Sequence, residues 1–137
     1  MNRAYVPAAL RRYVRNRAKN RCEYCLLPQT VAFFLHEPDH VRARKHGGEA
    51  IAENLALSCF DCNRFKGSDL ASIDPRTGEI AALFNPRNQA WTDHFRTEGG
   101  TIVPLTAAGR VTERLLKLNL PERVEVRQLL ADSGLFP

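Results

Sequence analysis

The chain has 137 residues, 44% of them hydrophobic, and a formal net charge of +5. This length and composition are ordinary for a single globular domain with a moderate core. No apolar run reaches the roughly 20 residues of a membrane helix, and no secretory signal is recognisable, so we expect a cytoplasmic protein without membrane contact.

The excess positive charge is concentrated near the amino terminus. Residues 1–21 contain seven basic side chains and no acidic one. Apolar residues at near-helical spacing, among them Leu10, Val14 and Ala18, predict a helix over residues 8–19 with a basic outer face. Such a segment attracts nucleic acid through phosphate contacts, and a merely solvated basic helix is the alternative. The basic residues are Arg3, Arg11, Arg12, Arg15, Arg17, Lys19 and Arg21.

The next part of the chain predicts a strand, a loop, a second strand and a helix. The β-branched and aromatic run at 31–35 leads into HEPDH, which indicates a strand with an edge or a bulge at Pro38. A loop follows over residues 42–53, where a glycine pair allows positive φ, and LALS at 55–58 indicates the second strand. Residues 60–66 then predict a helical turn that a glycine closes.

The carboxy-terminal half predicts two hairpins followed by two helices. Turn residues separate apolar flanks within SIDPRTGEI and within QAWTDHFRTEGGTIVPL, and we expect Trp91 and His94 to be structural. Thr106 is expected to cap the first helix, and Pro121 to open the second. Both helices carry apolar stripes that are expected to pack in the core. The stripes are Val111, Leu115 and Leu118, and then Val126, Leu129 and Leu130.

The four cysteines form two C-x-x-C pairs, Cys22 with Cys25 and Cys59 with Cys62. A two-residue spacer lets both thiolates of a pair face one ion, and two pairs complete a tetrahedral zinc site without an open position for a substrate. We therefore predict a structural Zn²⁺ site. A redox C-x-x-C motif and buried thiols are the alternatives.

Asp39-His40, Asn54 and Asn63 lie between and beside these pairs. The run HEPDHVRARKHGGEAIAENLALSCFDCNRFKG resembles the signature of the HNH endonucleases, with an Asp-His pair, a Gly-Gly loop, an Asn before Leu and a Cys-x-x-Cys-Asn-x-x-Lys helix. The likeness covers about residues 20–68 and departs from the family name at Asn63, which replaces the last histidine. The downstream segments LFNPR and W-x-x-HF also look similar to bacterial HNH proteins, without an assignable chemistry.

The resemblance implies an α+β fold. Its centre is a ββα-metal (His-Me finger) unit with a four-cysteine zinc site, flanked by the basic helix and by the C-terminal hairpins and two helices. We expect one HNH nuclease domain over residues 1–137, with a core at about 20–68 and a C-terminal extension at 69–137.

The resemblance also implies a metal-dependent endonuclease that hydrolyses phosphodiester bonds in DNA. Such a reaction needs an activated water and a cation at the phosphate. His40 is the candidate general base, provided that a neighbouring carbonyl fixes its tautomer. Asp39 and Asn63 offer oxygen ligands that suit Mg²⁺ or Mn²⁺. Asn54 would hold the loop by bridging backbone groups so that His40 faces the phosphate.

Basic side chains near these motifs are candidates for phosphate contacts, with solvated surface as the alternative. They are Arg11, Arg12, Arg15 and Arg17 in the first predicted helix, and Arg44, Arg64 and Lys66 beside the motif. DNA is the expected substrate and RNA stays open. The small size indicates either weak sequence specificity or a homodimer or separate partner that supplies it. The runner-up function is a non-catalytic zinc ribbon that binds nucleic acid, which would not require the Asp-His pair and both asparagines. A zinc-bearing protein adaptor would explain the cysteines but not the basic segment.

Overall fold

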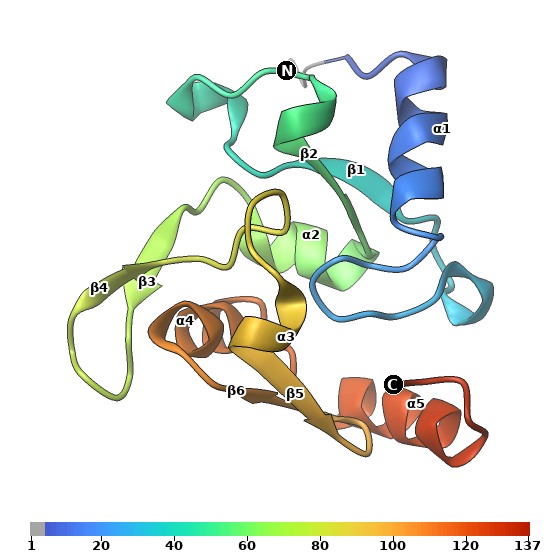
Figure 1. Cartoon of the computed structure of the whole chain (residues 1–137), viewed down its shortest axis with the longest axis vertical. Coiled ribbons are helices and arrows are strands. Elements are labelled where there is room, and N and C mark those ends of the chain that lie inside the picture. Colours follow the sequence, from blue (N-terminus) through green and yellow to red (C-terminus); the bar gives the residue numbers. More distant parts are fainter. Residues whose placement is uncertain (1–4) are drawn as a thin grey trace. The chain divides into compact units, whose positions relative to one another are not determined.

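The computed structural model describes residues 5–137, so Arg3 lies outside the described residues (Figure 1). The chain divides into two compact units. The first contains Met1–Leu70 and Asn85–Asn88, and the second contains Ala71–Phe84 and Gln89–Pro137. Each unit has buried apolar residues of its own, and the two are taken in turn.

The first unit is built on a β-β-α arrangement. Strand β1 (Glu37–His40) pairs antiparallel with β2 (Leu55–Ser58), and α2 (Phe60–Lys66) follows directly after β2. Helix α1 (Ala8–Arg17) packs alongside both strands, as Figure 1 shows. The prediction of an α+β fold with this central unit is therefore confirmed. The buried apolar residues of its core are Val6, Val14, Leu55 and Leu57.

Strand β1 contains Pro38, which lies opposite Leu57 in the register. The sheet has only two strands, so each strand is an edge and tolerates a residue that lacks an N–H donor. Alternation along β1 buries Asp39 and leaves His40 half-buried. The strand thereby places the acid inside the unit and the imidazole at its margin.

The strand predicted to run from 31–35 into HEPDH is confirmed around Pro38, but its first part at 31–35 is wrong. Gln29–Val31 form a 3-10 turn, and the chain enters a strand only at Glu37. Aromatic and β-branched residues favour a strand only where a partner strand can pair with them. One side of β2 pairs with β1, and on its other side Leu57 exchanges backbone and side-chain hydrogen bonds with Glu23. Phe33, Phe34 and Leu35 remain exposed.

The second unit begins with two hairpins, both as predicted. Strands β3 (Ala71–Ile73) and β4 (Ile80–Ala82) form the first. Strands β5 (Phe95–Glu98) and β6 (Thr101–Pro104) form the second, and the short helix α3 (Trp91–His94) precedes it. The turn chemistry of the sequence was sufficient to place both hairpins.

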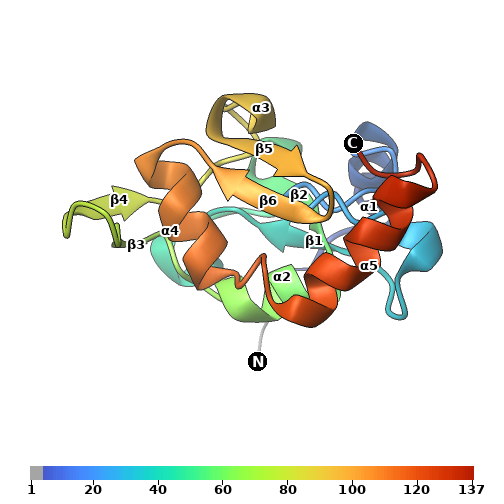
Figure 2. The same ribbon diagram turned by 90° about the horizontal axis from the view of Figure 1, so that it is seen from below.

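Helices α4 (Ala107–Leu115) and α5 (Pro121–Asp132) complete this unit. Figure 2 shows α4 alongside the β5–β6 hairpin, against which it packs. Thr106 caps α4 by accepting a hydrogen bond from the Gly109 N–H, and Pro121 opens α5, both as predicted. The buried apolar residues of this unit are Leu83, Phe84, Phe95, Ile102, Val111, Leu116, Leu118, Leu130 and Phe136.

The apolar stripe predicted for α5 is wrong in two of its three positions. Leu130 is buried, but Val126 and Leu129 are 41% and 64% exposed. The buried face of α5 instead carries Arg123 and Arg127, whose guanidinium groups donate hydrogen bonds to backbone carbonyl oxygens. Because these carbonyls satisfy the guanidinium donors, an arginine can occupy a buried position.

Among the helices of residues 5–137, none combines the length and the apolar character that crossing a membrane requires.

Candidate metal centre and active site

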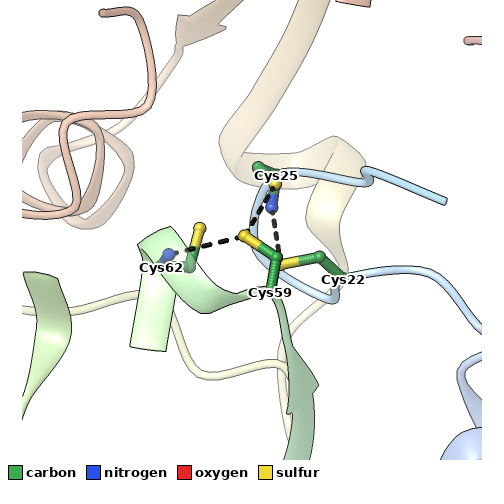
Figure 3. Close-up of side chains that lie close together, drawn as sticks. All are labelled: Cys22, Cys25, Cys59 and Cys62. Atoms are coloured by element: carbon green, nitrogen blue, oxygen red, sulfur yellow. Dashed lines mark hydrogen bonds between the residues drawn. The ribbon is translucent and has the colours of Figure 1, made fainter. Parts of the chain in front are cut away.

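The four cysteines lie together in the first unit, with their sulfur atoms within 4.8 Å of one another (Figure 3). Cys22 and Cys25 belong to the turn after α1, whereas Cys59 precedes α2 and Cys62 lies in its first turn. All four are buried. A tetrahedral site with Zn–S bonds of about 2.3 Å has its sulfurs about 3.8 Å apart, so small shifts suffice to enclose one ion.

Backbone groups orient the sulfur atoms within each pair. The N–H of Cys25 donates to Cys22 Sγ and the N–H of Cys62 donates to Cys59 Sγ, both at 3.4 Å. Burial raises the pKa of the Cys22 and Cys62 thiols well above the usual value, because a buried thiolate needs a nearby positive charge. A bound Zn²⁺ supplies that charge. The donor set therefore fits the predicted structural zinc.

The segment Asn85–Asn88 belongs to the first unit and braces the first cysteine pair. Glu23 exchanges two hydrogen bonds with Leu57, its N–H donating to the Leu57 carbonyl and its carboxylate accepting from the Leu57 N–H, both at 2.8 Å. Arg87 forms an ion pair with the same carboxylate, and each partner is 14% exposed. Arg87 thus gives the LFNPR segment a structural role. Sequence reasoning missed it because the motif alone does not name the partner.

Asp39, His40 and Asn63 line one pocket of about 570 Å³ in the first unit. Strand β1 supplies Asp39 and His40, and helix α2 supplies Asn63. The structure thus brings together three of the four residues predicted to be catalytic. The arginines that line the same pocket are Arg11, Arg44 and Arg64.

A buried network holds the Asp39 carboxylate. Its Oδ2 lies 3.1 Å from the Lys66 ammonium and accepts a hydrogen bond of 3.4 Å from the Tyr24 hydroxyl. Burial raises the pKa of Asp39, and the charge of Lys66 opposes that rise. Lys66 also donates to the His40 carbonyl at 3.0 Å, so one ammonium holds two neighbouring residues of β1.

Lys66 is only 2% exposed, and this burial does not fit the phosphate contact predicted for it. The sequence contained a usable signal. Cys62 and Lys66 are four residues apart in α2 and therefore share a face of the helix. Because Cys62 must face the buried metal centre, Lys66 faces inward as well. Tyr24 was also missed, since nothing in the C-x-x-C motif indicates that its spacer reaches Asp39.

His40 carries a pKa below its usual value. Partial burial is the main cause, and the positive charges of Lys66 and Arg44 add to it. The imidazole is therefore mainly neutral near pH 7 and able to accept a proton. Its Nε2 is buried and has no hydrogen-bond partner in the described part of the chain. The hydrogen bond to a neighbouring carbonyl that was expected to fix the His40 tautomer is therefore not made at Nε2.

Asn54 bridges backbone groups at both ends of the loop between the strands. Its Oδ1 accepts from the Arg42 N–H at 2.9 Å, and its Nδ2 donates to the carbonyls of Arg42 and Glu49 at 3.0 and 2.9 Å. The Val41 N–H donates to the Asn54 carbonyl at 2.8 Å. The side chain lies outside the lining of the pocket that holds His40, so it acts on that pocket through the loop.

Comparison with protein families gives one match in this region. Residues 22–69 match the model of a family described as HNH endonuclease. An HNH-type domain is thus recognised over residues 22–69, about a third of the chain. Comparison with curated proteins and with solved structures gave no match. The matched residues include the four cysteines and the four predicted catalytic residues, and an HNH domain implies a nuclease or nucleic-acid-binding function.

Helix α1 precedes the residues that match the HNH family, and most of its predicted phosphate-binding arginines make structural contacts. Arg15 and Arg17 donate to backbone carbonyls of neighbouring segments. Arg11 donates to the Glu37 carboxylate at 2.9 Å while also lining the pocket, and Arg12 is exposed. These arginine contacts thus attach α1 to the residues around β1 and β2.

Proposed function

We propose that the chain is a metal-dependent endonuclease that hydrolyses phosphodiester bonds in DNA. The observation that supports this function is the single pocket in which Asp39, His40 and Asn63 lie beside three arginines. A phosphodiester is an anion, and arginine side chains around a cleft attract it and hold it by its oxygen atoms. The same pocket then offers the imidazole and the oxygen ligands that hydrolysis requires.

In this proposal His40 removes the proton from the attacking water. The water oxygen bonds to phosphorus as the bond from phosphorus to the leaving oxygen breaks. Asp39 and Asn63 present a carboxylate and an amide oxygen, which are hard donors suited to Mg²⁺ or Mn²⁺. That ion, when bound, supplies positive charge at the phosphate and at the leaving oxygen. Asn54 keeps the loop after His40 in place.

The proposed activity resides in the HNH core at about 20–68, within a single domain that includes the extension at 69–137. DNA is preferred over RNA as the substrate in this proposal, and the setting is the cytoplasm. Any sequence specificity would come from a homodimer or a separate partner in this proposal.

One observation favours a second function, a non-catalytic zinc module that binds nucleic acid. The Asp39 carboxylate is already paired with the buried Lys66 ammonium, and such a pair can serve structure alone. The two functions differ in what they require of His40. A binding module has no use for a proton acceptor in the pocket.

Supercoiled plasmid cleavage separates the two functions. The zinc-bound wild type and His40→Ala are incubated with Mg²⁺, with Mn²⁺ and with neither, and nicked and linear products are quantified. We expect cleavage only with an added ion, and a loss of about a hundredfold or more in His40→Ala, because general base catalysis contributes on this scale.

His46→Ala is the matched control, because His46 is exposed and makes its hydrogen bond to the Ser68 carbonyl. It should cleave like the wild type, and all three proteins should hold the same amount of zinc. Undiminished cleavage by His40→Ala would show that His40 is not the general base. A shift in plasmid mobility without cleavage by any of the proteins would favour the binding module.

A further inference from the structure

Three phenylalanines, Phe33, Phe34 and Phe60, form an aromatic cluster on the surface of the HNH domain. Phe33 is 93% exposed, and Phe34 and Phe60 are each 49% exposed. The rings of Phe34 and Phe60 stack with centroids 4.5 Å apart and an interplanar angle of 31°. Phe33 meets Phe34 edge-on, with centroids 4.9 Å apart. The rings contact one another and yet leave aromatic faces open to water.

The core of this unit does not account for the cluster. Its apolar residues come from α1, from β2 and from the chain before α1, and none of the three rings belongs to it. Leu35, next to the cluster, is also 57% exposed. Contiguous apolar surface of this kind is unfavourable in water and marks a place where a ligand or a partner binds.

The cluster is continuous with the candidate active site. Phe60 lines the same pocket as Asp39, His40 and Asn63. Arg64, also in the lining, places its guanidinium carbon 5.6 Å from the centre of the Phe60 ring. Phe60 therefore lies at the boundary between the polar pocket and the exposed aromatic rings.

A nucleotide presents the same two chemistries side by side. Its phosphate is anionic, and its base has an aromatic face that stacks on phenylalanine whatever the base sequence. A second copy of this chain or an apolar peptide would match the rings but not the arginines of the adjoining pocket. Charge complementarity and continuity with the pocket both favour a nucleotide strand.

We propose that the aromatic cluster stacks an unpaired nucleobase adjacent to the phosphate held in the pocket. This inference rests on the proposed nuclease function and defines its substrate as DNA that is single-stranded or unpaired at the cut site. Bases within a duplex are covered on both faces by their neighbours, so a duplex must be opened before a base reaches the rings.

The test measures binding of the zinc-bound full chain, without Mg²⁺ or Mn²⁺, to fluorescent oligonucleotides. The three probes are a single strand, an abasic strand of equal length and a fully paired duplex, and anisotropy gives each affinity. The wild type should bind the single strand about tenfold more tightly than the abasic strand, which has the same phosphates but no bases.

Variants at Phe33 separate stacking from general apolar contact. Phe33→Leu keeps an apolar side chain without an aromatic face, and it should lose most of the preference for the base-containing strand. Phe33→Trp should keep the preference, and its added fluorescence should be quenched by the single strand but not by the abasic one. Because Phe33 is 93% exposed, these substitutions should leave the fold intact, and zinc content checks this.

Two results would overturn the proposal. Phe33→Leu and Phe33→Ser could bind all three probes as the wild type does, or light scattering could show a dimer that Phe33→Ser dissociates, which would assign the cluster to a second copy. Plasmid cleavage is scored separately. Base-dependent binding by a protein that never cleaves would contradict the nuclease function and support the stacking site. Cleavage by the wild type, together with Phe33 variants that bind all probes as the wild type does, would contradict only the stacking site.

Discussion

Lys66 holds two adjacent candidate catalytic residues through one buried ammonium. It lies against the Asp39 carboxylate and donates to the His40 carbonyl, and it is 2% exposed. We expect Lys66→Met to lower the free energy of unfolding by about 3–5 kcal/mol, because it leaves a buried carboxylate without an opposing charge. Urea denaturation of the zinc-bound protein measures this loss.

Two further variants show whether the ion pair is responsible. Arg64→Met removes an exposed charge from the same helix and should change the free energy of unfolding by no more than about 0.5 kcal/mol. Adding Asp39→Asn to Lys66→Met should recover much of the stability, since it removes the uncompensated charge. Equal stability of Lys66→Met and Arg64→Met would show that the pair contributes nothing.

For single residues, the sequence predicts the chemical role of a side chain better than it predicts whether that side chain is buried. Residue type and spacing were enough to select Asp39, His40 and Asn63, and the structure places them in one pocket. The positive charges were harder to assign. A lysine or arginine in the sequence looks the same whether it faces a phosphate or donates to a buried carbonyl. The spacing from Cys62 indicates the inward orientation of Lys66, whereas only the fold reveals that of Arg17.

Among the elements, the loop between β1 and β2 depends on a close approach at Gly48. A Cβ at this position would lie 1.7 Å from the Arg42 carbonyl oxygen and 2.8 Å from Asn54 Nδ2. Gly48→Ala must therefore displace the backbone segment that Asn54 holds and that leads away from His40. We expect plasmid cleavage to fall about a hundredfold while zinc stays bound, because small displacements of a reacting group are costly.

Gly47→Ala is the matched control for this loop. Gly47 has open space around its Cβ position but a φ of 87°, so alanine there is strained without meeting a neighbour. It should cost about 1 kcal/mol of stability and leave cleavage nearly intact. Equal loss of cleavage in both variants would mean that the loop responds to backbone strain rather than to the contact between Gly48 and Asn54.

Local signals predicted most elements and failed where long-range partners decide the outcome. Turn residues placed both hairpins, and Thr106 and Pro121 placed the starts of α4 and α5. The run at 31–35 had the composition of a strand but found no partner. In α5 the buried position went to Arg127, because carbonyls of Gly100 and Leu118 accept its donors, and helical spacing carries no information about such acceptors.

At the scale of the whole chain, the zinc ligands and the apolar cores are distributed unequally. All four cysteines belong to the first unit, where the site joins the turn after α1 to the start of α2. Apart from the cysteines, the apolar core of that unit is small. The second unit has a larger set of buried apolar residues and no cysteine. The metal should therefore matter far more to the first unit than to the second.

Zinc removal tests this distribution. A chelator should remove one Zn²⁺ per chain and expose the first unit to rapid hydrogen exchange, because buried thiols without a metal cannot hold the two cysteine pairs together. Amides of β5, β6 and α4 should stay protected, and the emission of Trp91, the single tryptophan, should stay that of a folded side chain stacked on Phe95. Restored protection after zinc is added back is the control for irreversible damage. If protection is lost throughout residues 89–137 at the same time, the 137 residues form one cooperative domain whose stability depends on the metal as a whole.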